Sequence, residues 1–105
     1  MSNPRAVSVR IDQSLLDVID AHCQSQSVKR SRYMAQCAVK QAKRINKGKK
    51  PLYLENDIEP ENPTTITVSL SARREELIQE ACAKVNHKIS TFIVWATQAN
   101  LEQQA

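Results

Sequence analysis

Hydrophobic and polar residues alternate in two short segments of the chain. Apolar side chains occupy every second position of residues 7–11 and again of residues 66–70, and polar side chains stand between them. A period of two is typical of a β-strand with one buried and one exposed face. Because a lone strand with free edges is unstable, we expect these two strands to pair with each other or with the strands of a second molecule.

Each predicted strand leads into an apolar stripe with the spacing of an amphipathic helix. Asp12 or Ser14 can begin the first of these helices and Ser71 can begin its counterpart, because short oxygen-bearing side chains cap helix N-termini. The stripe of the first helix contains Leu15, Leu16, Val18, Ile19 and Cys23, and that of its counterpart contains Leu77, Ile78, Ala81 and Cys82.

A further helix follows in each case, after a turn that lacks glycine. At the turn, Asn86 tolerates a left-handed backbone, and Ser27 does so less readily. Ser31 and Ser90 are predicted to cap the helices that follow. The inward faces of these helices carry Tyr33, Met34, Cys37 and Ala38 in one case and Phe92, Ile93, Ala96 and Ala99 in the other.

The whole pattern therefore occurs twice, at an offset of 59 residues and without a gap. Residues 6–44 overlay residues 65–103, and the identical pairs are Val9/Val68, Ile19/Ile78, Cys23/Cys82, Lys29/Lys88 and Ser31/Ser90. A unit of about 40 residues seldom buries enough surface to fold alone, so we expect the two copies to fold together. The predicted organisation is a first repeat in residues 1–44, a linker in residues 45–64 and a second repeat in residues 65–105.

The net charge of +4 conceals a steep gradient along the chain. Residues 1–50 carry 11 Lys and Arg against 3 Asp, a net charge of +8, whereas residues 51–105 carry 4 against 8 acidic residues, a net charge of −4. This asymmetry indicates that the first half meets a polyanion and that the second half does something additional; a chance distribution is the alternative.

Several classes of protein are disfavoured by the sequence. No segment approaches the roughly 18 apolar residues of a membrane span, and the N-terminus lacks the apolar core of a signal peptide, so we expect a cytoplasmic protein without membrane contacts. Three cysteines without a CxxC spacing argue against a disulfide framework or a zinc site, and Cys23 and Cys82 are expected to act as small apolar residues. His22 and Cys23 point about 100° apart on a helix and form no metal pair, and His87 is interpreted as a turn residue. Without a catalytic constellation, we expect neither an enzyme nor a cofactor.

Each copy is predicted to consist of a short alternating strand and two helices, with a Ser that caps the second helix and a Tyr/Phe–Met/Ile pair after it. This pattern resembles the ribbon-helix-helix superfamily of DNA-binding proteins, the Arc and MetJ type. Residues 7–11 and 29–34 carry the likeness in the first copy, and residues 66–70 and 90–93 carry it in the second. Two fused copies also resemble the tandem architecture of some conjugation accessory proteins. The resemblance implies a mostly α fold with a short two-stranded antiparallel β-ribbon, formed within one chain as a pseudo-dimer or between chains. This chain lacks the glycine that the family often has before its second helix.

The ribbon of this family enters the major groove of double-stranded DNA. The resemblance therefore implies sequence-specific DNA binding, as a transcriptional repressor or as a DNA-organising accessory factor of plasmid, phage or conjugation type. Arg10 is the strongest candidate for base reading, because a guanidinium can bind guanine O6 and N7 together. The DNA-binding residues expected on this basis are Arg5, Ser8, Arg10, Lys29, Arg30, Ser31, Arg32, Thr65, Thr67, Ser69, Lys88 and Ser90.

Phosphate anchoring has a separate physical basis. The free backbone N–H groups of a helix N-terminus attract anions, and Lys29, Arg30 and Arg32 surround one such end. The equivalent end in the second copy has only Lys88, so we expect the first copy to hold DNA more strongly. Solvated surface charges are the alternative interpretation.

The last helix carries more apolar residues than one face can bury. Trp95 either packs beneath the linker or forms, with Val94, an interface for a protein partner or for self-association through the second repeat. The alternative function is accordingly an antitoxin or inhibitor that binds a partner protein through the second repeat or the linker.

Overall fold

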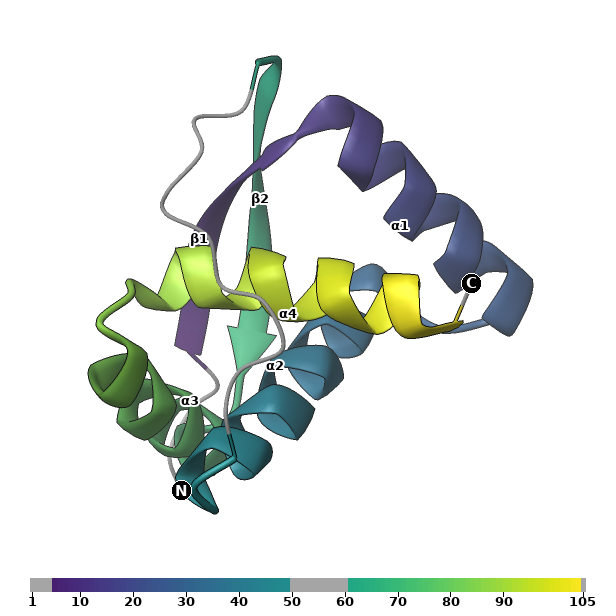
Figure 1. The fold of residues 1–105 in the computed structure, drawn as a ribbon. Coiled ribbons are helices and arrows are strands. Elements are labelled where there is room, and N and C mark those ends of the chain that lie inside the picture. The colour runs from purple at the N-terminus through teal and green to yellow at the C-terminus, as the bar shows by residue number, and fades with distance from the viewer. Residues whose placement is uncertain (1–4, 50–60, 105) are drawn as a thin grey trace.

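The structure, a computed structural model, describes residues 5–49 and 61–104. In these residues the order of strand, helix and helix occurs twice, as predicted (Figure 1). The elements are β1 (Arg5–Asp12), α1 (Gln13–Gln26), α2 (Arg30–Asn46), β2 (Pro63–Leu70), α3 (Ala72–Val85) and α4 (Ile89–Gln104). The prediction of a mostly helical fold with a two-stranded antiparallel ribbon is confirmed. Residues 50–60, most of the predicted linker, lie outside the described residues, and both α2 and β2 extend into its predicted ends.

The two strands pair antiparallel within the one chain. Ser8 lies opposite Thr67, which is its own counterpart 59 residues further on, so the register is symmetric about this pair. Side chains that alternate with Ser8 and Thr67 turn toward the helices and are buried or half-buried, as the period of two predicts. They are Val7, Val9, Ile11, Ile66, Val68 and Leu70.

All the helices lie on one side of the ribbon, and α4 crosses in front of both strands in the view of Figure 1. Each long helix packs against the strand of the other repeat, α2 against β2 and α4 against β1. The two repeats therefore share one hydrophobic core, which confirms that they fold together. Its largest fully buried side chains include Phe92, Ile19, Met34, Ile78 and Ile93.

The first helix of each repeat begins and ends at matching positions. Asp12 caps α1 by accepting from the Ser14 amide at 3.0 Å, and Ser71 caps α3 by accepting from the Arg74 amide at 3.3 Å. The hydrogen bonds from the Ser14 amide and hydroxyl hold the pKa of the Asp12 carboxyl below its usual range. At the other end, Ser27 and Asn86 both adopt the left-handed backbone, with φ of 55° and 58°. Ser27 thus adopts the left-handed backbone, although serine tolerates this conformation less readily than asparagine.

The prediction that Ser31 and Ser90 cap the second helices is wrong. Helix α2 begins at Arg30 and α4 at Ile89, so both serines lie inside the first helical turn. The backbone carbonyls of Lys29 and Lys88 accept from the amides of Tyr33 and Phe92, each at 2.9 Å, and close that turn two residues earlier than a cap at the serine allows. The Ser31 hydroxyl is used elsewhere, because it accepts a hydrogen bond from the backbone amide of Ser69 in β2 at 2.9 Å.

The first helices of the two repeats, α1 and α3, are not packed equally closely against the rest of the protein. Helix α3 packs on α2, where Asn46 donates to the carbonyl of Leu77 at 3.2 Å. Val18 of α1 is the repeat counterpart of Leu77, yet its side chain is 54% exposed. The first repeat therefore has the more open of the two outer helices.

Candidate nucleic-acid interface

The side of the ribbon that faces away from the helices is a small polar surface. We call it the exposed ribbon face, and its residues are Ala6, Ser8, Arg10, Thr65, Thr67 and Ser69, all exposed. In the paired strands Arg10 lies opposite Thr65, Ser8 opposite Thr67 and Ala6 opposite Ser69. Hydroxyl groups both donate and accept hydrogen bonds and a guanidinium donates several, so this face can form hydrogen bonds with base edges. Its short side chains let the backbone approach a ligand closely.

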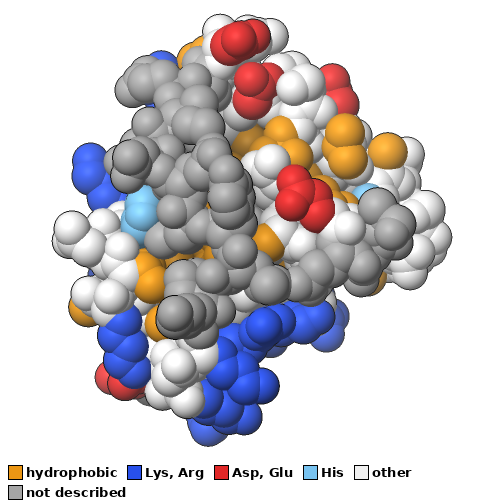
Figure 2. All heavy atoms as spheres, in the orientation of Figure 1, with side chains coloured by type: hydrophobic (Ala, Val, Ile, Leu, Met, Phe, Trp, Pro, Cys, Tyr) orange, Lys and Arg blue, Asp and Glu red, His pale blue; other side chains and the backbone are white. Residues whose placement is uncertain are grey.

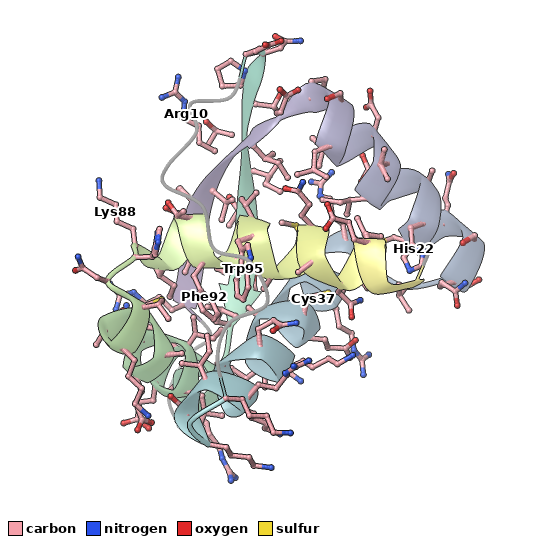
Figure 3. All side chains as sticks on the ribbon, viewed as in Figure 1. Arg10, His22, Cys37, Lys88, Phe92 and Trp95 are labelled. Atoms are coloured by element: carbon pink, nitrogen blue, oxygen red, sulfur yellow. The ribbon has the colours of Figure 1, made fainter. Side chains whose placement is uncertain are left out.

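Arg10 is the charged member of this face. Figure 3 shows its side chain directed away from the body of the molecule. The strand places it beside Thr65, which combines a guanidinium and a hydroxyl at one end of the exposed ribbon face. This end therefore offers the strongest hydrogen-bond donor of the surface.

Arg5 occupies a different position from the other predicted DNA-binding residues of β1. It shares the inward parity of Val7, lies opposite Leu70 and donates to the Glu75 carboxylate of α3 at 2.7 Å. The guanidinium thereby links the start of β1 to the second repeat. Arg5 thus lies off the exposed ribbon face, although it was predicted among the DNA-binding residues.

The start of α2 brings three cations near the ribbon. The bond from the Ser69 amide to Ser31 fixes this helix end beside β2. Lys29 and Arg32 are exposed, whereas Arg30 is half-buried and donates to the Asp20 carboxylate of α1 at 3.2 Å. Lys29 and Arg32 are thus the side chains best placed to hold an anion at this helix N-terminus.

The start of α4 is less charged. Lys88 is exposed, and Ser90 is half-buried in the first turn. Ile89 and Thr91 stand where the first repeat has Arg30 and Arg32. The structure therefore brings every predicted DNA-binding residue except Arg5 to the exposed ribbon face or to the helix N-termini beside it.

A line of basic residues along α2 was missed by the sequence prediction. Lys40 and Lys43 in α2 and Lys47 at its C-cap recur every three or four residues, all exposed, and α2 contains no acidic residue. Figure 2, viewed from the helix side, shows Lys and Arg side chains gathered along the lower edge, where α2 runs. The sequence alone could have predicted this line of lysines, because residues three or four apart lie on the same face of a helix.

The cysteines and the aromatic pair of α4 belong to the core. Burial raises the pKa of the Cys37 and Cys82 thiols to about 11, so both stay protonated near neutral pH. Trp95 and Val94 are half-buried against the core, and the Trp95 ring lies 5.4 Å from that of Phe92. Neither is presented as the exposed aromatic anchor that a protein interface uses.

In residues 5–49 and 61–104, no group of three His, Cys, Asp or Glu side chains is arranged to hold a metal ion. None of the helices described is both long enough and apolar enough to span a bilayer. No protein-family model, curated protein or solved structure matches the chain.

Proposed function

We propose that this chain is a tandem ribbon-helix-helix protein whose two repeats form an intramolecular pseudo-dimer that binds double-stranded DNA. The exposed ribbon face enters the major groove and reads base edges, and the N-termini of α2 and α4 hold the flanking phosphates. Such a protein acts as a transcriptional repressor or as an accessory factor that organises DNA for a partner. It needs no cofactor and performs no catalysis.

The observation that carries this proposal is the composition of the exposed ribbon face beside two helix N-termini. A two-stranded ribbon fits the major groove, which is about 12 Å wide, and hydroxyl and guanidinium groups match the donors and acceptors displayed there. The same ribbon buries an apolar inner face, so its polar outer face is the surface available for a ligand. Lys29, Arg32 and Lys88 add positive charge at its margins.

The proposal is tested by selecting bound duplexes from a random DNA pool with the full-length chain. We expect a defined site, with affinity that falls steeply as salt rises. Arg10→Ala should weaken binding and relax base preference at one position, by about 1–3 kcal/mol of discrimination.

Lys43→Ala is the matched control for Arg10→Ala, because it removes one positive charge from an exposed residue of α2 near its C-terminus. It should leave base preference unchanged. Failure of the parent protein to bind any duplex at low salt would overturn the proposal, as would equal loss of base preference in the two variants.

A further inference from the structure

The two ends of the exposed ribbon face carry different groups. Arg10 and Thr65 form one end, and Ala6 and Ser69 form the other. Thr65 and Ser69 are four residues apart along β2, which is about 13 Å at 3.3 Å per residue. Among the six residues of the face, Arg10 alone is charged, so only one end presents a guanidinium.

The charged N-terminus of α2 lies at the end opposite to Arg10. Although α2 and Arg10 belong to the same repeat, α2 packs against β2 rather than against its own strand. The 2.9 Å bond from the Ser69 amide to the Ser31 hydroxyl places the first turn of α2 at the Ser69 end. Lys29 and Arg32 therefore lie at the opposite end of the ribbon from Arg10, the residue that can bind a base edge.

The N-terminus of α4 lies on the Arg10 side. Helix α4 packs against β1, and Figure 3 shows Lys88 and Arg10 on the same side of the molecule. Ile89 and Thr91 add no charge here. One end of the ribbon thus combines a base-reading guanidinium with a weakly charged helix end, and the other combines small side chains with a strongly charged helix end.

We infer that the chain binds its DNA site in one orientation only, with the two tasks divided between unequal half-sites. Arg10 selects a guanine in one half-site, while Lys29 and Arg32 hold phosphates of the other. This inference rests on the proposed function. Because phosphate contacts position a protein without reading sequence and base contacts specify it, the sequence requirement lies in the Arg10 half-site and the other half-site tolerates substitution.

The test uses the site selected by the full-length chain and maps the contacts by chemical interference. Methylation of guanine N7 should block binding in one half-site, and ethylation of phosphates should interfere more strongly in the other. The exchange variant Arg10→Ser/Ser69→Arg keeps the net charge and moves the guanidinium to the counterpart position. On the site selected by the parent, this variant brings the guanidinium and the charged end of α2 to the same end of the ribbon, so ethylation interference should move into the half-site that contains the guanine.

The substitutions are compatible with the fold. Residues 10 and 69 are both exposed, and the amide that Ser69 donates to Ser31 belongs to the backbone, so a new side chain at this position leaves the bond in place. Equal thermal unfolding midpoints of the parent and the exchange variant check this. Arg32→Ala provides a second variant, which should lower affinity equally for all single-base variants of the site and remove ethylation interference only in the half-site remote from the guanine.

The outcomes separate this inference from the proposed function. A palindromic selected site with guanine contacts in both half-sites would overturn the inference while leaving DNA binding intact. So would ethylation interference that stays in the half-site remote from the guanine in the exchange variant, or loss of ethylation interference beside the guanine in Arg32→Ala. Absence of binding to any duplex would instead overturn the proposed function and, with it, the inference.

Discussion

The hydroxyl of Ser31 accepts a hydrogen bond of 2.9 Å from the backbone amide of Ser69, so a side chain of the first repeat pairs with an amide of the second. A serine in the first turn of a helix ordinarily serves that helix. Here it joins α2 to β2 and sets where the charged helix end lies along the ribbon.

Ser31→Ala should lower the free energy of unfolding by about 1 kcal/mol, because the Ser69 amide loses its protein acceptor. Ser31→Thr keeps a hydroxyl and should lose less. Urea denaturation followed by circular dichroism measures the difference. Ser90→Ala is the matched control, since it removes the counterpart hydroxyl from α4. Equal losses in the two alanine variants would contradict the assigned role of Ser31.

Ser27→Gly should stabilise the protein by about 1 kcal/mol. Ser27 has a φ of 55°, a backbone conformation that costs a residue with a Cβ roughly 1–2 kcal/mol and costs glycine little. Asn86→Gly should give a smaller gain, because asparagine tolerates the left-handed region. Thermal unfolding of both variants checks the order. A destabilised Ser27→Gly protein would show that the serine side chain stabilises the turn.

Gln41→Met should raise the free energy of unfolding by about 1 kcal/mol. The Gln41 side chain is 1% exposed, and its Nε2 has no hydrogen-bond partner in the structure described. A buried amide without a hydrogen-bond partner destabilises the folded state, because it has lost its hydration. A thioether of similar shape has no such desolvation cost. Gln36→Met, at an exposed position of the same helix, controls for the change in helix propensity. Greater loss of stability in Gln41→Met than in Gln36→Met would mean that the buried amide is hydrogen-bonded in solution.

The stability of the protein should fall between about pH 9 and pH 11. Burial raises the pKa of Cys37 from its ordinary value near 9 to about 11, so the folded state keeps a proton that the unfolded state has released. The stabilisation is complete below about pH 9 and is lost as the pH rises through 11. The buried Cys82 thiol, whose pKa is also raised to about 11, contributes over the same range, and Tyr33, whose pKa is raised from 10 to about 12 mainly by burial, contributes between about pH 10 and pH 12.

Cys37→Ala isolates the contribution of this thiol. Ala96 already occupies the counterpart position in α4, so alanine is compatible with the helix packing there. The unfolding midpoint of the variant should decline less steeply from pH 9 to 11 than that of the parent. Parallel pH profiles would rule out titration of Cys37 as a cause.

On the proposed DNA-binding function, Lys29→Ala and Arg32→Ala should each reduce the slope of log affinity against log salt by about 0.9, the value expected for one phosphate contact. Arg30→Ala should reduce it less, because the Arg30 guanidinium is bound to the Asp20 carboxylate. Fluorescence anisotropy over a range of salt concentrations measures the slopes. A larger effect at Arg30 than at Arg32 would reverse the assignment of the two arginines.

The strands and the shared core followed directly from the sequence. The alternation around Val9 and Val68 fixes which face of each strand is buried, and the offset of 59 residues repeats it. Pairing within one chain did not follow, because two equivalent strands satisfy the same alternation within or between molecules. In the structure, β1 pairs with β2 of the same chain.

The candidate site was predicted less completely, for reasons of long-range geometry. Local preference assigned Ser31 to a cap, whereas its partner lies 38 residues away in β2. Arg5 already had the inward parity of Val7, but its partner Glu75 becomes visible only when α3 is placed beside the ribbon. The packing of α2 against the strand of the other repeat likewise cannot be predicted from neighbouring residues in the sequence. The inferred single orientation on DNA depends on this packing.

Because β1 and β2 belong to the same polypeptide, closing the ribbon is a unimolecular event. A ribbon assembled from two chains falls apart with dilution, and its population varies with the square of the free chain concentration. Here the unfolding midpoint should be the same at nanomolar and micromolar protein, and the folded fraction in a cell would not depend on how many molecules the cell holds.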